Sequence, residues 1–123
     1  MANTFKVTSA DVGTSYAAAL TAGGSETIIV IGLNVANMHS STDSWMSAKV
    51  VQSGGGSESI LVHEINVPIN DSFNPVSGKL VLEAGDALHL DAENSSSLEA
   101  TISHMVITCV IYQEDERLVL WEP

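Results

Sequence analysis

The chain has few basic residues, few aromatic residues, one cysteine and no long apolar stretch. Of its 123 residues, four are Lys or Arg and fifteen are Asp or Glu, which gives a formal net charge of −11. The basic residues are scattered singly: Lys6, Lys49, Lys79 and Arg117. Binding along a phosphate backbone, or to an anionic membrane surface, requires clustered cations. We therefore expect neither nucleic acid nor a membrane as a partner.

The scarcity of aromatic residues, cysteine and long apolar runs further limits the kind of protein this can be. With two residues each of Phe, Trp and Tyr, the core must be aliphatic. Cys109 lies inside an apolar run, where we expect a buried small hydrophobe; the alternative is an intermolecular disulfide. No charged segment followed by an apolar one resembles a secretory signal, and no apolar run approaches the roughly 20 residues that span a bilayer. We expect a soluble protein made in a cytoplasm.

The segment from residue 79 to 92 is the most informative one present. Leucines recur at every second position on both sides of Ala84-Gly85-Asp86. Alternation with a period of two around a Gly-Asp corner is typical of two strands joined by a turn. The sequence therefore predicts a hairpin over about 79–93.

The rest of the chain repeats this pattern. Continuous β-branched residues over 26–37 predict a central strand covered on both faces. Further strands are predicted over 5–8, 15–22, 45–53 and 58–67, the longest strand is predicted over 98–111, and 68–78 is predicted to be a long connection. About eight strands with turns rich in Gly, Ser and Asn predict an all-β fold. We expect a single antiparallel β-sandwich, jelly-roll-like, over residues 1–112.

The strand predicted over 98–111 changes character along its length. Apolar residues occupy even positions up to Ile102, and from Met105 onward both parities are apolar. Either a bulge near His104 flips the strand, or its second half is covered on both faces. The second cover would be loops of the other sheet or another subunit.

The segment 113–123 is an acidic spacer followed by apolar residues, which is unusual near a chain end. Leu118, Val119, Leu120 and Trp121 would each gain about 1.5–3 kcal/mol on burial. Two interpretations stay open for this segment. It is either a closing edge strand of its own sandwich or a C-terminal arm that docks on a neighbouring subunit.

The sequence offers no assembled chemistry. The histidines lack the spacing of a metal site: His39, His63, His89 and His104. No Gly-x-Ser-x-Gly elbow is present. We expect no catalytic residue, no cofactor and no metal ion.

Two weaker possibilities concern acidic and aromatic residues. Asp86, Asp91 and Glu93 could supply oxygen ligands to Ca²⁺, but their spacing does not match an EF-hand loop, and a solvated acidic edge is the expected role. Trp45 offers a flat apolar face that could stack on a sugar ring. The alternative function is therefore a carbohydrate-binding or receptor-binding β-sandwich module.

Four segments together carry a resemblance to a known class of proteins. They are Val7–Ser15, Ile28–Asn37, Lys79–Leu88 and Leu98–Thr108. In these segments the chain resembles small bacteriophage virion structural proteins, which decorate the capsid, collar or tail. The resemblance implies a jelly-roll sandwich without enzyme activity that is made in the host cytoplasm and located in the virion. It also implies a homo-oligomer, with a trimer expected, attached to other phage shell, neck or tail proteins.

The predicted contact residues lie at the two ends of the chain. Phe5 stands near the N-terminus, and Leu118, Val119, Leu120 and Trp121 stand near the C-terminus. We expect these side chains to contact sister subunits or the particle.

Overall fold

The computed structural model describes seven stretches of the chain. They are residues 2–39, 41–53, 56–76, 78–94, 97–108, 111–114 and 117–120, with side chains described within 3–108. Cys109 and Trp121 lie outside the described residues. In the described part, no helix is long and apolar enough to cross a membrane.

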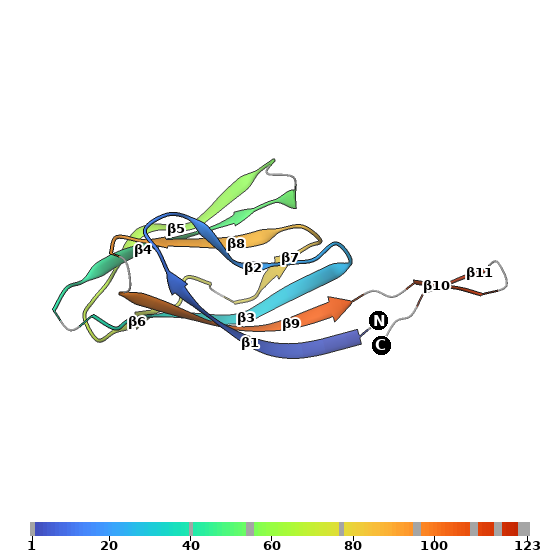
Figure 1. Cartoon of the computed structure of the whole chain (residues 1–123), viewed down its shortest axis with the longest axis horizontal. Helices are drawn as coiled ribbons and strands as arrows, with labels where there is room; N and C mark the ends of the chain where they lie inside the picture. Colours follow the sequence, from blue (N-terminus) through green and yellow to red (C-terminus); the bar gives the residue numbers. More distant parts are fainter. Residues whose placement is uncertain are drawn as a thin grey trace.

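Nine strands form two antiparallel sheets that face each other (Figure 1). Sheet A contains β1 (Ala2–Val12), β9 (Leu98–Thr108), β3 (Glu26–Asn37) and β6 (Ser72–Phe73) in that order, and β7 (Leu80–Leu82) also pairs with β3. Sheet B contains β2 (Ala17–Thr21), β8 (Ala87–Ala92), β4 (Ser44–Val51) and β5 (Glu58–Val67). A separate pair consists of β10 (Ile111–Glu114) and β11 (Arg117–Leu120).

Strands from the first half of the chain pair with strands from the second half, in the order of a jelly roll. β1 pairs with β9, β2 with β8, β3 with β6 and β7, and β4 with β5. Successive pairs alternate between the two sheets, so the sheet orders are those of a jelly roll. This confirms the predicted all-β jelly-roll sandwich.

The core between the sheets is aliphatic, as the composition requires. Its fully buried side chains come from the central strands of both sheets, chiefly Ile28, Leu33, Met46, Leu88 and Ile102. In β8 and β9 the even-numbered residues point inward, since the burial pattern alternates along both strands. Alternation thus identified the buried face of these strands.

The predicted hairpin over 79–93 is wrong in its pairing. β7 pairs with β3 in sheet A, whereas β8 pairs with β2 and β4 in sheet B. Leu82 and Leu88 are both fully buried, and they approach one core from opposite sheets. The turn at Gly85 therefore carries the chain from one sheet to the other.

A bulge at Ile31 explains the continuous apolar run of β3. The register with β9 shifts between Val30 and Gly32, and the buried parity changes from even to odd there. Within the described chain only one face of β3 is covered, so the predicted cover on both faces is not found. Ile31 itself is 44% exposed.

The structure of β9 explains why its sequence becomes apolar at both parities after His104. Its even-numbered residues remain buried from Leu98 to Val106, and His104 is one of them. The bulge lies opposite, in β3, because Val30 pairs with His104 and Gly32 pairs with Ser103. Met105 therefore faces outward although it is apolar.

Beyond β9 the chain continues into the β10–β11 pair. Leu120 lies opposite Ile111, and Val119 lies opposite Tyr112. In Figure 1 this pair lies past the end of sheet A, beside the two termini and away from the faces of the sandwich. Among the described strands, β10 and β11 pair only with each other.

Candidate functional site

The outer face of sheet A carries a row of apolar side chains that crosses the sheet. Phe5 lies opposite Met105, Met105 opposite Ile29, and Ile29 opposite Val81. Four strands distant in sequence therefore contribute one side chain each. Residues that are directly opposite on one face of a sheet stand close enough to touch.

Two further residues enlarge this row on the side of the bulge. Val7 follows Phe5 on the same face of β1, and Ile31 projects from the bulge of β3. We call the set the apolar patch: Phe5, Val7, Ile29, Ile31, Val81 and Met105. A shallow hollow of about 230 Å³ is lined by Phe5, Lys6, Val7, Ile31, Ser103 and His104.

The apolar patch is well exposed to solvent in the single chain. Phe5 is 73% exposed, Val7 68% and Val81 52%. Single exposed apolar residues are ordinary, but a contiguous group that spans a sheet marks a contact surface.

Charge is distributed unevenly around the apolar patch. The far end of the same face is acidic, where Asp11 lies opposite Glu99. Near the patch, Lys6 stands on the edge strand β1, and Lys79 directly precedes β7 at the other edge. Within the described part of the chain neither lysine forms an ion pair. Lys6 lies opposite the inward-facing His104 and is therefore on the other face of β1 from the apolar patch, so Lys79 is the lysine at the rim of the patch.

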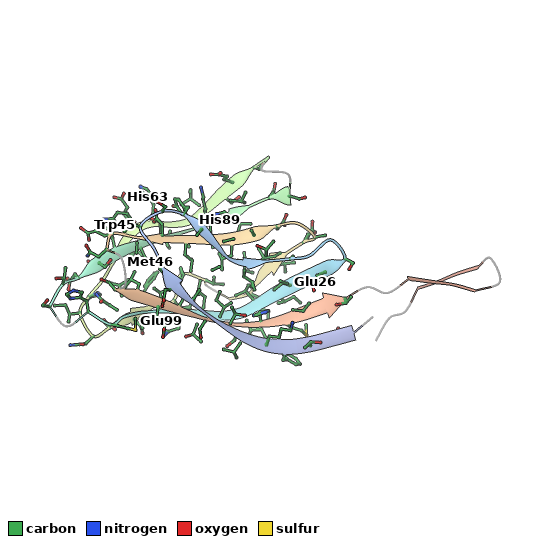
Figure 2. All side chains as sticks on the ribbon, viewed as in Figure 1. Glu26, Trp45, Met46, His63, His89 and Glu99 are labelled. Atoms are coloured by element: carbon green, nitrogen blue, oxygen red, sulfur yellow. The ribbon has the colours of Figure 1, made fainter. Side chains whose placement is uncertain are left out.

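The outer face of sheet B carries polar side chains that pair with one another. Lys49 Nζ lies 3.0 Å from Glu58 Oε1 and 4.0 Å from the centre of the Tyr16 ring. Burial raises the pKa of Asp91, the Glu64 carboxylate raises it further, and Ser47, His63 and Lys49 act in the opposite direction. The Oδ1 atom of Asp91 is buried without a hydrogen-bond partner in the described part. Figure 2 shows Trp45, His63 and His89 on this sheet.

The acidic and histidine residues considered from the sequence do not converge. Among the described residues, no group of three His, Cys, Asp or Glu side chains is placed to hold a metal ion. The Asp86 carboxylate instead accepts the backbone N–H of Ser53 at 3.0 Å and that of Glu83 at 3.1 Å. It therefore fixes the turn between the sheets.

Of the predicted contact residues, only Phe5 can be placed with its side chain. It lies on the edge strand β1, at one end of the row of apolar side chains that crosses sheet A. Leu118, Val119 and Leu120 belong to β11, whose side chains are not described, and Trp121 lies outside the described residues. Met105 was noted from the sequence as the start of a run that is apolar at both parities, whereas Val7, Ile29, Ile31 and Val81 were missed. For Ile29 and Ile31 the signal was the run of residues 28–31, which is apolar at both parities.

The fold places the chain in the class of jelly-roll sandwiches, and the solved structures that are similar to it include viral ones. A capsid structure of Helicobacter pylori bacteriophage KHP30 is similar over 100% of this chain and 95% of that chain, at 4% identity and a TM-score of 0.48. A pentameric capsid protein from metagenomic phage sequences is similar over 83% and 62%, at 16% identity and a TM-score of 0.40.

A third similar structure is much larger than this chain. The VP2 subviral particle of infectious bursal disease virus is similar over 85% of this chain, at 9% identity and a TM-score of 0.48. This chain spans about a third of that one, namely 32%. No protein-family model and no curated protein matches the sequence. Likenesses at these scores do not define a family for the chain.

Proposed function

We propose that this chain is a non-enzymatic structural protein of a bacteriophage virion. It builds a rigid sandwich, associates with copies of itself and attaches to the particle as a capsid decoration, collar or tail accessory protein. The observation that carries the proposal is the apolar row from Phe5 to Val81, which stands on the solvent side of a sheet in a chain of net charge −11. The jelly-roll topology and the sequence resemblance support it.

Energetics favour contact with a partner over exposure. Phe5 and Val7 gain about 1.5–3 kcal/mol each when their side chains leave water. A stable interface is depleted of charge at its centre, and the apolar patch meets that condition because its six members are uncharged. The patch is thus suited to face another protein.

The proposed partners are copies of the chain and shell, neck or tail proteins of the same particle. Identical subunits form closed symmetric oligomers in most cases. We propose a homo-oligomer, with a trimer as the expected order, in which residues 113–123 act as an arm.

The mass of the full chain in solution tests this function. Sedimentation equilibrium should give a fixed multiple of 12.9 kDa, three for the expected trimer, and a larger complex with the phage's shell or tail proteins. Deleting residues 117–123 should leave a folded sandwich that assembles less well. A monomer at all concentrations that turns over a small molecule would end the proposal.

A second candidate function is glycan binding by sheet B. Trp45 is half-buried on this sheet, and its backbone N–H donates to Glu93 Oε1 at 3.4 Å. An aromatic ring beside carboxylates suits a sugar, which has an apolar ring face and hydroxyl donors. A glycan array with the full chain and Trp45→Ala as control separates this candidate from the first.

A further inference from the structure

We infer that the apolar patch is the acceptor site for the C-terminal segment, residues 113–123, of a neighbouring copy of the chain. The inference rests on the proposed self-assembly and names the two surfaces that meet. The arm of one subunit lies on the outer face of sheet A of the next.

The chemistry of the two surfaces is complementary. The arm carries acidic Glu114, Asp115 and Glu116, followed by the apolar run Leu118–Trp121. The apolar patch offers apolar side chains with Lys79 at the rim beside Val81. Opposite charges at the rim favour encounter and fix orientation, while apolar contact supplies affinity.

The dimensions of the two surfaces agree as well. The row from Phe5 to Val81 crosses four strands, a span of about 14 Å at the usual strand spacing. Four extended residues such as Leu118–Trp121 cover about 13 Å. A stable interface between whole domains uses roughly 20–30 residues a side, so a patch of six apolar residues suits a short segment better.

The position of β10 and β11 favours docking on a neighbour. The chain leaves sheet A at Thr108, opposite Ala2. The β10–β11 pair then continues past the end of the sheet (Figure 1), so it leaves the apolar patch of its own subunit uncovered. An arm that reaches forward onto the next copy makes a head-to-tail contact, and such contacts form a ring when the rotation between successive copies closes.

Mixing two full-length variants tests the inference. Phe5→Thr/Val7→Thr removes the acceptor, and Leu118→Ser/Leu120→Ser removes the arm. Threonine keeps strand propensity, and both acceptor positions are mostly exposed, so the fold should persist. Each variant alone should sediment as a monomer, because each lacks one half of every contact. An equimolar mixture should form dimers, since one intact arm then meets one intact patch.

A matched control tests whether the removal of an exposed apolar side chain outside the patch also weakens assembly. Ile60 is 55% exposed on sheet B, and Ile60→Thr should assemble like the unchanged chain. Circular dichroism and urea unfolding establish that every variant is folded.

The outcomes separate this inference from the proposed function. If the unchanged chain is an oligomer and Phe5→Thr/Val7→Thr is still that oligomer, the acceptor site is wrong and self-assembly stands. If both variants are monomers and their mixture stays monomeric, the arm and the patch do not meet between copies. If the unchanged chain is itself monomeric, the proposed assembly fails, and the acceptor site with it.

Discussion

Phe5 on β1 and Met105 on β9 lie directly opposite each other on the outer face of sheet A. The next residue of β9, Val106, points inward and is 6% exposed. Two adjacent apolar residues thus serve different purposes. One packs the core, and the other belongs to the apolar patch.

This division predicts that substitutions of the two neighbours have opposite main effects, one on stability and the other on self-assembly. Val106→Thr places a hydroxyl in the core and should lower the free energy of unfolding by about 1–3 kcal/mol, because the buried hydroxyl lacks a partner. Met105→Thr should lower it by less and should weaken self-assembly more. Urea unfolding and sedimentation of both variants check this. Equal losses of stability would mean that β9 is buried on both faces within the single chain.

The second prediction concerns Asn37, a buried polar residue at the end of β3. Its Nδ2 donates to the Val67 carbonyl at 2.9 Å and to the Thr42 carbonyl at 3.1 Å, and its Oδ1 accepts the His39 N–H at 2.9 Å. Asn37→Ala leaves the buried Val67 carbonyl without this donor. We expect a loss of about 1–3 kcal/mol in the free energy of unfolding.

The matched control for Asn37 lies on the same strand. Asn34 is exposed, so Asn34→Ala should change the free energy of unfolding by no more than about 0.5 kcal/mol. Urea titrations of both variants give the two values. Similar losses from the two variants would show that the contacts of Asn37 do not hold the loop between β3 and β4.

Alternation in the sequence predicted the strands and the sandwich but not the partners of each strand. A period of two reports which face of a strand is buried, and Leu80, Leu82, Leu88 and Leu90 do pack toward the core. It says nothing of whether the neighbouring strand is the next one in the chain. The pairing of β7 with β3 depends on contacts about fifty residues apart, which local patterning does not encode.

The sequence singled out Phe5 and the run from Met105, but it did not predict the apolar patch as a whole, because the patch is assembled by register. Its other members reveal themselves as apolar residues of the wrong parity, and a bulge at Ile31 changes that parity within β3. Continuous apolar sequence is typical of strands buried on both faces, and this chain uses it for a strand with one covered face. The sequence signal of an interface and that of a central strand are therefore the same.

The third prediction concerns Gly85, which has φ +86° in the turn between β7 and β8. A side chain there costs about 1–2 kcal/mol in the backbone alone. A Cβ atom would also lie 2.8 Å from Ser53 Cβ. Gly85→Ala should therefore lower the free energy of unfolding by more than that amount, since neither strain nor contact is relieved without moving the turn.

Gly78 supplies the control for Gly85. Its φ is +85°, and a Cβ atom there would meet no atom of the described residues within 4 Å. Gly78→Ala thus reports backbone strain without the contact, and its loss of stability should be the smaller of the two. Equal losses in the free energy of unfolding, measured by urea titration, would show that Ser53 moves away from the new Cβ atom without cost.

The fourth prediction is a pH dependence set by Asp91 on sheet B. Burial and the Glu64 carboxylate raise the pKa of Asp91 above its ordinary value of 3.8, so the folded chain binds its proton more tightly than the unfolded chain. The free energy of unfolding therefore falls as pH rises from 3.8 through the raised pKa, and stays lower above it. Asp91→Asn should be more stable than the unchanged chain at pH 7, and this difference should shrink on acidification. Urea unfolding from pH 3 to 7 and a carboxyl NMR titration measure both effects; an Asp91 that titrates below 3.8 would contradict them.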